Sequence, residues 1–434
     1  MFLPRGTSRS KLGPDFQRIW ASVTVSSLGD GMRFVALPLL AAQLTSDPRQ
    51  VAFVYVAEQL PLLLFGLLSG AIADRFDRSR ILWAVDAART VIVGALAVAV
   101  ATHTMTILVL TGIGFLLGLG QTLYNGAWSG IVPSLVASPE LTRANARLQS
   151  GSLITDTLLG TPLGALLFGI AAALPFAVDA VSFAIAAALA LTLNRGIRSH
   201  PQAAPNPWRT LLGDTTQGVR WLWQQPLLRR LCLASGISNL VGGGLIAILV
   251  LYARQILGLT SIGFAFLVAS FAIGGVAGAM ATPRLCARFG TSWVLRLTAA
   301  ATAGTAVAAG AASSGLIAGA CIAAYGAANL TWNVTAVSVR QAMVPTHLLG
   351  RVGMAYQMVI GAGTTLGAAL AGLEADSFGL RAPFYIGSAL LLVASMVSMR
   401  SNGTSTPRKE TPLTAHRHRR RAGDTQTTGP ESDR

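Results

Sequence analysis

Residues 70–80 read Gly-Ala-Ile-Ala-Asp-Arg-Phe-Asp-Arg-Ser-Arg, a short charged stretch between two long apolar runs. The run before it covers 51–73 and the run after it covers 81–102. Each run is close to the roughly twenty residues that a helix needs to cross about 30 Å of hydrocarbon. The stretch therefore predicts two membrane-spanning helices joined by a tight, charged loop at the membrane surface.

The rest of the chain continues this pattern. Of its 434 residues, 52% are hydrophobic and only 12% are charged, which is more apolar than a water-soluble domain can hide in its core. Twelve apolar spans are predicted, at 17–42, 51–73, 81–102, 105–126, 145–169, 174–193, 229–253, 260–282, 290–311, 315–337, 350–373 and 381–400. We expect an all-α integral membrane protein with twelve transmembrane helices, which excludes soluble enzymes, coiled coils and disordered chains.

Two pairs of similar segments indicate an internal repeat. GAIA at 70–73 matches GAMA at 278–281, and GTPLGA at 160–165 matches GTTLGA at 363–368, with offsets of 208 and 203 residues. Each pair lies at equivalent spans, which predicts two pseudo-symmetric halves, an arrangement that many secondary transporters share. The expected regions are an N-terminal six-helix half (1–193), a cytoplasmic central loop (194–228), a C-terminal six-helix half (229–400) and a disordered basic cytoplasmic tail (401–434).

The basic residues fall mostly between the predicted spans and on one side. Of the 33 Lys and Arg residues, 27 lie on the side that carries both termini, three on the other side and three inside spans. Because short cytoplasmic loops hold an excess of Lys and Arg, both termini are predicted to be cytoplasmic. The basic residues that give the net charge of +16 then orient the chain in the bilayer. A nucleic-acid partner is not needed to explain this charge.

The charged loop resembles the loop signature of the major facilitator superfamily, in which a Gly is followed by Asp-Arg and further basic residues. Twelve spans and a long central loop extend the resemblance over almost the whole chain. Several stretches are similar to bacterial exporters related to the enterobactin exporter and the macrolide efflux proteins. These are Ser27-Leu-Gly-Asp-Gly31, Asp86-Ala-Ala-Arg89, the stretch 218–229 and Gly350-Arg351-Val352. The resemblance implies a multi-pass protein of a bacterial plasma membrane.

The same resemblance implies a cytoplasmic gate formed by Gly70, Asp74, Arg75 and Arg78. Asp74 would cap the start of the eleventh helix in the outward-facing state, where free N–H groups and the helix dipole favour an anion. Arg75 and Arg78 would hold that carboxylate by charge-assisted hydrogen bonds. The alternative is an ordinary positively charged turn. One departure from the family is that the fourth span lacks the Arg that many relatives place there.

Ionisable residues inside spans are expensive, so each needs a partner, a cavity or a function. Asp30 and Arg33 lie three residues apart on the first helix and can reach each other. The resemblance places this helix at the transport pathway, so the pair either couples protons to the conformational change or is a permanent structural ion pair. Glu58 has no basic residue nearby in sequence, and we expect it to stay protonated as a second coupling residue.

Five further charged groups lie inside spans. Asp156, on the fifth helix, has no cationic residue nearby in sequence. It either has a structural role, paired with a group on a neighbouring helix, or takes part in proton coupling. The Asp86–Arg89 pair, Asp179 and Arg296 fall on helices that the resemblance makes peripheral. We expect these four to be structural.

A polar, aromatic face is predicted on the tenth helix. Tyr325, Asn329 and Trp332 lie at i, i+4 and i+7, which places them on one side near the middle of the membrane. Asn239 on the seventh helix is expected to join them. Such a face suits an amphipathic ligand, although aromatic and amide groups also serve helix packing.

Taken together, these patterns predict a monomeric transporter that exports a small amphipathic compound, such as a drug or a siderophore-like metabolite, by proton antiport. No catalytic residue, metal site or cofactor is expected, because no phosphate-binding loop is encoded and the His residues lie at span ends or in loops. Two alternatives use the same architecture: an importer or uniporter of a small metabolite, and a membrane sensor that does not transport.

Overall fold

A computed structural model describes residues 13–136, 140–192, 217, 219–345 and 348–399, and the regular elements in these ranges are helices. The first half contains α1 (Pro14–Leu44), α2 (Pro48–Arg75), α3 (Arg78–Ala101), α4 (Ile107–Leu135), α5 (Leu141–Leu153), η2 (Ile154–Gly160), α6 (Thr161–Ile170) and α7 (Leu174–Leu191). The second half contains α9 (Pro226–Leu251), η3 (Tyr252–Ile256), α10 (Ser261–Phe289), α11 (Thr291–Ala311), α12 (Gly315–Met343), α13 (Leu349–Phe378) and α14 (Ala382–Met399).

Each predicted span corresponds to one helical rod. The fifth rod is continuous through α5, η2 and α6, where η2 is a π-helical segment, and the seventh continues from α9 into η3. Within the described residues, ten rods are long and apolar enough to cross a membrane. The remaining two, α2 and α14, lie at the second and twelfth predicted spans. The all-α, twelve-helix membrane fold expected from the sequence therefore fits the structure.

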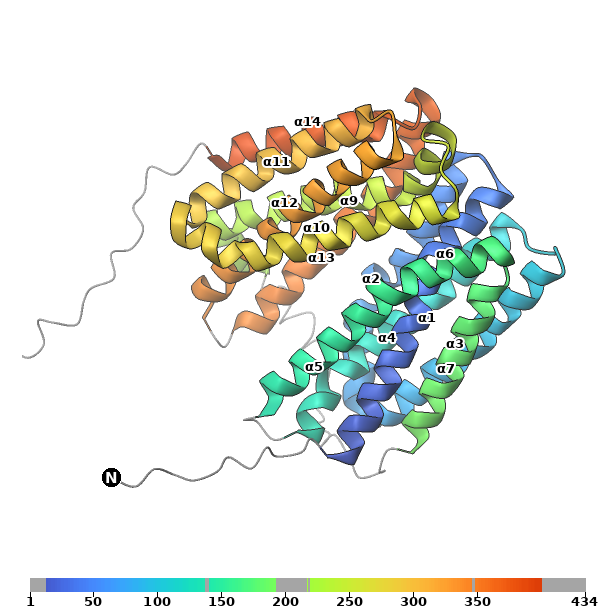
Figure 1. Ribbon diagram of the computed structural model, residues 1–434. Coiled ribbons are helices and arrows are strands. Elements are labelled where there is room, and N and C mark those ends of the chain that lie inside the picture. Colours follow the sequence, from blue (N-terminus) through green and yellow to red (C-terminus); the bar gives the residue numbers. More distant parts are fainter. Residues whose placement is uncertain (1–12, 137–139, 193–216, 218, 346–347, 400–434) are drawn as a thin grey trace, which may run out of the picture.

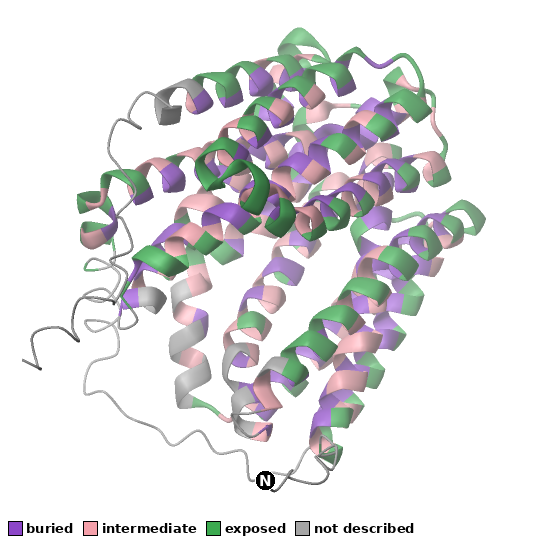
Figure 2. Ribbon diagram, turned by 60° about the vertical axis from the view of Figure 1, so that its left-hand side comes forward, coloured by how far each residue is buried: buried purple, intermediate pink, exposed green. Residues whose placement is uncertain are grey.

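Apolar side chains cover the outside of the bundle while several charged ones are inside it. Leu108, Leu316 and Ile170 are each more than three-quarters exposed, whereas Arg33 and Asp179 are buried. In Figure 2, exposed positions follow the outer faces of the rods and buried positions face inward. In a soluble protein, apolar side chains lie mostly inside and charged ones outside. The opposite distribution found here suits a protein surrounded by hydrocarbon.

Equivalent helices pack in equivalent ways in the two halves, which lie side by side in Figure 1. Helix α2 packs on α4 as α10 packs on α12, and α3 packs on α7 as α11 packs on α14. The repeated glycine motifs occupy matching places: Gly164 lies against the backbone of Met32 on α1, and Gly367 lies against the backbone of Leu240 on α9. The absence of a Cβ allows these backbones to approach closely.

The two halves touch each other at one end of the bundle. We call the end that carries Pro14 and the end of α14 the terminal side, and the opposite end the far side. On the far side α2 packs on α13 and α6 packs on α10. Ala52, Val56, Ala247 and Ala368 form a small apolar cluster there, and Arg49 Nε lies 3.5 Å from Asp376 Oδ2. Toward the terminal side the halves diverge (Figure 1).

We predict that Gly367→Ala destabilises the protein. A Cβ at residue 367 overlaps the carbonyl oxygen of Leu240, so α13 and α9 must separate, at a cost of about 1–3 kcal/mol. Gly361→Ala on the same helix is the matched control, because a Cβ there meets nothing within 4 Å. Thermal unfolding of both purified variants checks this, and equal melting temperatures would contradict the packing described.

Candidate functional site

A cavity of about 1040 Å³ lies between the two halves. Its lining extends from Tyr55 and Leu249, toward the far side, to Trp128 and Gln149, toward the terminal side. Both halves contribute, but the described lining residues of the second half carry no charged side chain. The charged chemistry of the cavity therefore belongs to the first half.

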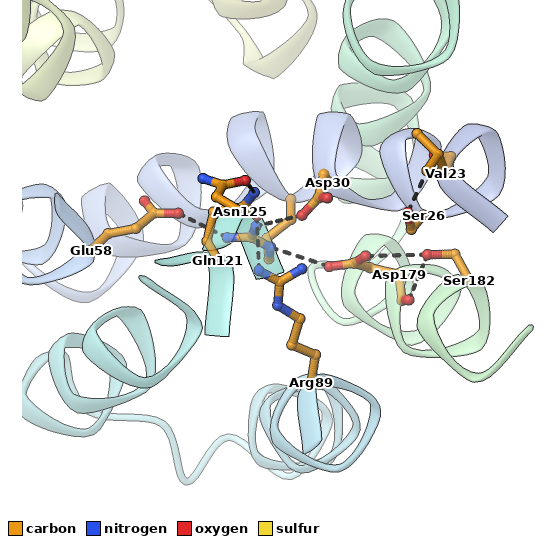
Figure 3. A network of polar contacts seen from close by, with 10 residues as sticks. Val23, Ser26, Asp30, Glu58, Arg89, Gln121, Asn125, Asp179 and Ser182 are labelled. Carbon is orange, nitrogen blue, oxygen red and sulfur yellow. Dashed lines mark hydrogen bonds and ion pairs between the residues drawn. The ribbon is translucent and has the colours of Figure 1, made fainter. Parts of the chain in front are cut away.

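The guanidinium of Arg33 is the centre of that chemistry. Its Nη2 lies 2.7 Å from Asp30 Oδ1, its Nη1 lies 2.9 Å from Glu58 Oε1, and its Nε lies 3.3 Å from Asp179 Oδ2. The three carboxylates come from α1, α2 and α7 and converge on one point (Figure 3). A planar guanidinium with five donors can serve three acids at once. We call these four residues the Arg33 cluster.

The three carboxylates differ in their access to the cavity. The side chains of Asp30 and Glu58 are 28% and 22% exposed and line the cavity, whereas that of Asp179 is fully buried. Asp179 sits against α1 because residue 29 is glycine: a Cβ there would collide with the side chains of Asp179 and Ser182. Two of the three acids are therefore accessible from the cavity.

The structure adds two contacts that the sequence did not predict. Glu58, which has no basic residue nearby in sequence, contacts Arg33. Asp179, expected on a peripheral helix, also contacts Arg33 and is buried. Their sequence distances from Arg33, 25 and 146 residues, conceal the contacts. The Asp30–Arg33 contact was expected, because it is local to one helix.

A second polar group lies beside the Arg33 cluster. Arg89 Nη2 donates to Gln121 Oε1 at 2.8 Å, and Gln121 Nε2 donates to Asn125 Oδ1 at 3.0 Å. The Arg89 guanidinium also lies 5.4 Å from the ring centre of Tyr124 and 5.2 Å from that of Phe183. Arg89 thus reaches from α3 to the cavity and contacts α4, the helix that lacks an Arg of its own.

Arg89 lines the cavity, so this part of α3 is not peripheral as the resemblance implied. Asp86, one turn earlier, is buried, and its Oδ1 has no hydrogen-bond partner among the described residues. The sequence contained one signal for this group: Gln121 and Asn125 are two amides at i and i+4 inside an apolar span. Arg296, on α11, does not line the cavity.

Asp156 lies in the π-helical segment η2 and lines the cavity. Within the described ranges it forms no ion pair. Its backbone carbonyl lies against residue 31 of α1, where only a glycine fits. The ion pair with a neighbouring helix that the structural interpretation of Asp156 would supply is therefore not seen among the described residues.

The polar wall of the second half is close to the one expected. Asn239, Tyr325 and Asn329 line the cavity, and Asn329 Nδ2 donates to Ser238 Oγ at 3.1 Å. Trp332 does not line it, which corrects the sequence interpretation. Its indole is buried where α9, α12 and α13 meet, and its Nε1 donates to Ser235 Oγ at 3.4 Å.

The predicted cytoplasmic gate falls largely outside the described part of the structure. The backbone of α2 continues to Arg75, but the surroundings of Gly70 and the side chains of Asp74 and Arg75 lie outside the described part of the structure. Arg78 begins α3, and the residue before it, Asp77, caps that helix by accepting from Ser79 N at 2.9 Å. The gate remains a prediction.

The sequence matches the family described as "Transmembrane secretion effector" over residues 12–420. The chain belongs to this family of major facilitator transporters. Two relatives of this transporter are similar over most of their length. YfiS of Bacillus subtilis (strain 168), named an uncharacterized MFS-type transporter, is 25% identical over 87% of this chain and 91% of its own. The multidrug efflux pump Tap of Mycolicibacterium fortuitum is 27% identical over 90% and 96%.

Solved structures share the fold of this transporter. The nucleoside transporter NupG, as its D323A mutant, superposes with a TM-score of 0.73 at 14% identity and covers 89% of this chain and 99% of its own. A bacterial homologue of the iron transporter ferroportin, solved in an inward-facing state, superposes with a TM-score of 0.71 at 17% identity over 90% and 99%. At these identities the likeness establishes the fold of the transporter and not its cargo.

We predict that Arg33→Gln strongly destabilises this transporter, because it leaves three carboxylates without their shared cation. Removing one partner of a buried ion pair costs about 3–5 kcal/mol. Adding Asp30→Asn to Arg33→Gln should restore part of the loss, because it removes one of the unpaired charges. Thermal unfolding of the purified variants measures both effects.

The control for that experiment is Arg49→Gln. The Arg49 side chain is 55% exposed, and its ion pairs are worth about 0–1 kcal/mol, so this variant should melt close to the wild type. An Arg33→Gln variant as stable as Arg49→Gln would show that the Arg33 cluster does not hold the helices together.

Proposed function

We propose that this transporter exports a small amphipathic compound from the cytoplasm by proton antiport and alternating access. One observation carries the proposal: a buried guanidinium shared by three carboxylates stands at the wall of a cavity between two halves whose described residues pack together on the far side. Ionisable groups inside a membrane are costly and mark ion or substrate pathways.

The excess of Lys and Arg on the terminal side makes that side cytoplasmic in this proposal. The far side then faces the exterior of a bacterial plasma membrane, and the structure represents the inward-open state. The inward-facing state of the ferroportin homologue, whose fold is the same, is consistent with this orientation. Cargo would enter the cavity from the cytoplasm.

Proton coupling would act through the two cavity-facing acids of the Arg33 cluster. Protonation of Glu58 removes the charge that ties α2 to Arg33, and protonation of Asp30 frees another guanidinium donor. Asp179, which is fully buried, stays as the constant partner on α7. Each proton thus weakens one link between helices of the first half, which biases the equilibrium between the two open states.

The direction of transport is supported by relatives and not by geometry. The name of Tap describes a multidrug efflux pump, and the resemblance of the loop motifs also favours exporters. A nucleoside transporter shares the fold, so import of a metabolite by the same cavity is the second candidate. Flux measurements distinguish export from import, and a membrane sensor that does not transport would show no flux in either direction.

Cells expressing the protein should accumulate less of at least some fluorescent amphiphiles and antibiotics than cells without it. A protonophore should abolish most of the difference, and so should Asp30→Asn, because each removes a proton-driven step. A protonophore-insensitive difference would rule out proton antiport. Higher accumulation would favour import, and unchanged accumulation of every compound would contradict broad drug export.

A disulfide across the far side should stop transport if the halves must separate there. In a variant lacking Cys232, Cys286 and Cys321, Ala52→Cys with Gly372→Cys supplies the pair. A Cβ at residue 372 lies 2.8 Å from the Ala52 Cβ, so a small outward shift gives the roughly 3.5–4.5 Å that a disulfide needs.

Oxidation of that double variant should abolish flux, and reduction should restore it. Ala52→Cys alone is the control and should transport under both conditions. Unimpaired flux in the oxidised double variant, with the cross-link verified by mass spectrometry, would contradict alternating access through the far side.

A further inference from the structure

We propose that the transported compound is a lipophilic cation and that Asp156 is the residue that balances its charge. The inference rests on the proposed transport function and assigns Asp156 to the cargo, separately from the Arg33 cluster. It follows from three features of the cavity: its excess of carboxylates, the setting of Asp156, and the uncharged wall that faces it.

Acids outnumber bases around the cavity. Among the described residues, five carboxyl groups stand in or directly behind its first-half wall, against two guanidiniums: Asp30, Glu58, Asp86, Asp156 and Asp179, with Arg33 and Arg89. The second-half lining supplies no charge. An ionised carboxylate in such a setting attracts a cation and repels an anion.

The two guanidiniums at the cavity, those of Arg33 and Arg89, already contact protein groups. Arg33 is committed to Asp30, Glu58 and Asp179 at 2.7, 2.9 and 3.3 Å, and Arg89 donates to the amide of Gln121. Asp156 is left without an ion pair among the described residues, although it lines the same cavity. A cationic group of the cargo is the counter-charge that the protein does not provide.

The backbone holds Asp156 in a fixed place. The π-helical segment η2 packs on α1, where Gly31 allows the Asp156 carbonyl to approach, and Gly160 lies against the Leu28 carbonyl. A Cβ at residue 31 would lie 2.8 Å from Asp156 Oδ1, so the carboxylate lies beside α1 at the cavity wall. π-helical turns inside α-helices frequently occur at functional sites.

The opposite wall suits the apolar part of such a compound. Phe271 and Tyr325 lie with their ring centres 6.1 Å apart, and Val268, Val276 and Leu330 line the cavity with them. Aromatic faces attract cations as well as apolar groups. Tyr325 adds a polar point: it is 93% buried, and its hydroxyl has no hydrogen-bond partner among the described residues. A buried hydroxyl without a partner favours a ligand that supplies one.

A pair of probes of one shape and opposite charge tests the charge preference. Tetraphenylphosphonium and tetraphenylborate are of similar size and apolar character, and differ in the sign of their charge. Equilibrium dialysis of the purified protein in detergent, with protein-free micelles as the blank, measures binding of each. The wild type should bind the phosphonium at least about tenfold more tightly than the borate. Equal affinities, or tighter borate binding, would overturn the cationic assignment.

Variants then test Asp156 itself. Asp156→Asn should lower the phosphonium affinity about tenfold or more and leave borate affinity unchanged or higher, while Asp156→Glu should keep the preference. Glu374→Gln is the matched control, because Glu374 is a half-buried acid on α13 that does not line the cavity. Unchanged phosphonium binding in Asp156→Asn would overturn the role of Asp156. Retained borate binding and thermal unfolding show that the variant is folded.

The Tyr325 hydroxyl is tested with a cation that can accept a hydrogen bond. Tyr325→Phe should weaken binding of rhodamine 6G severalfold and leave the phosphonium unaffected, because the phosphonium has no group that can bond to the hydroxyl. Equal effects on both probes, or none, would remove the hydroxyl from the site.

These binding assays fail or succeed independently of transport. Absence of proton-driven flux in proteoliposomes, with phosphonium binding intact, would overturn the antiport proposal alone. Proton-driven flux of neutral compounds without phosphonium binding would overturn the cationic cargo alone.

Discussion

The structure depends on the need of one buried cation for counter-charge. Arg33 sits on a helix surrounded by apolar rods, where an uncompensated guanidinium would cost more than a marginally stable protein can lose. Three carboxylates from three helices supply the negative charge, and their contacts with Arg33 hold α1, α2 and α7 together at one point. The same contacts that stabilise the first half place titratable groups at the wall of the cavity.

The sequence was sufficient to predict the fold, because the length of an apolar span and the position of Arg residues are constraints set by the bilayer itself. It was also sufficient for the Asp30–Arg33 contact, which is local to one turn of helix. The sequence did not predict the contacts of Glu58 and Asp179 with Arg33, because Arg33 lies on another helix and meets them only through the packing of the helices. Trp332 shows a related limit. Helical periodicity predicted which face of α12 carries Trp332, but it could not predict that α9 and α13 approach closely and bury the indole away from the cavity.

Small residues determine how closely the helices approach. Gly29 admits Asp179 to α1, Gly31 admits the backbone of η2, and Gly164 and Gly367 make equivalent contacts in the two halves. In hydrocarbon, such packing supplies much of the association energy that the hydrophobic effect supplies in water. The repeated motifs therefore carry packing information, and the polar residues that differ between the halves carry the chemistry.

That difference between the halves has an evolutionary consequence. Among the described residues, the charged groups of the cavity stand on one half, and the facing wall consists of amide, hydroxyl, aromatic and aliphatic side chains. Substitutions on the facing wall can alter the shape that is accepted without disturbing the ionic balance around Arg33. If the first half couples transport to protons, as proposed, it can be kept while the other half diversifies, and a lineage can then acquire new cargoes through point mutations in a single half of the gene.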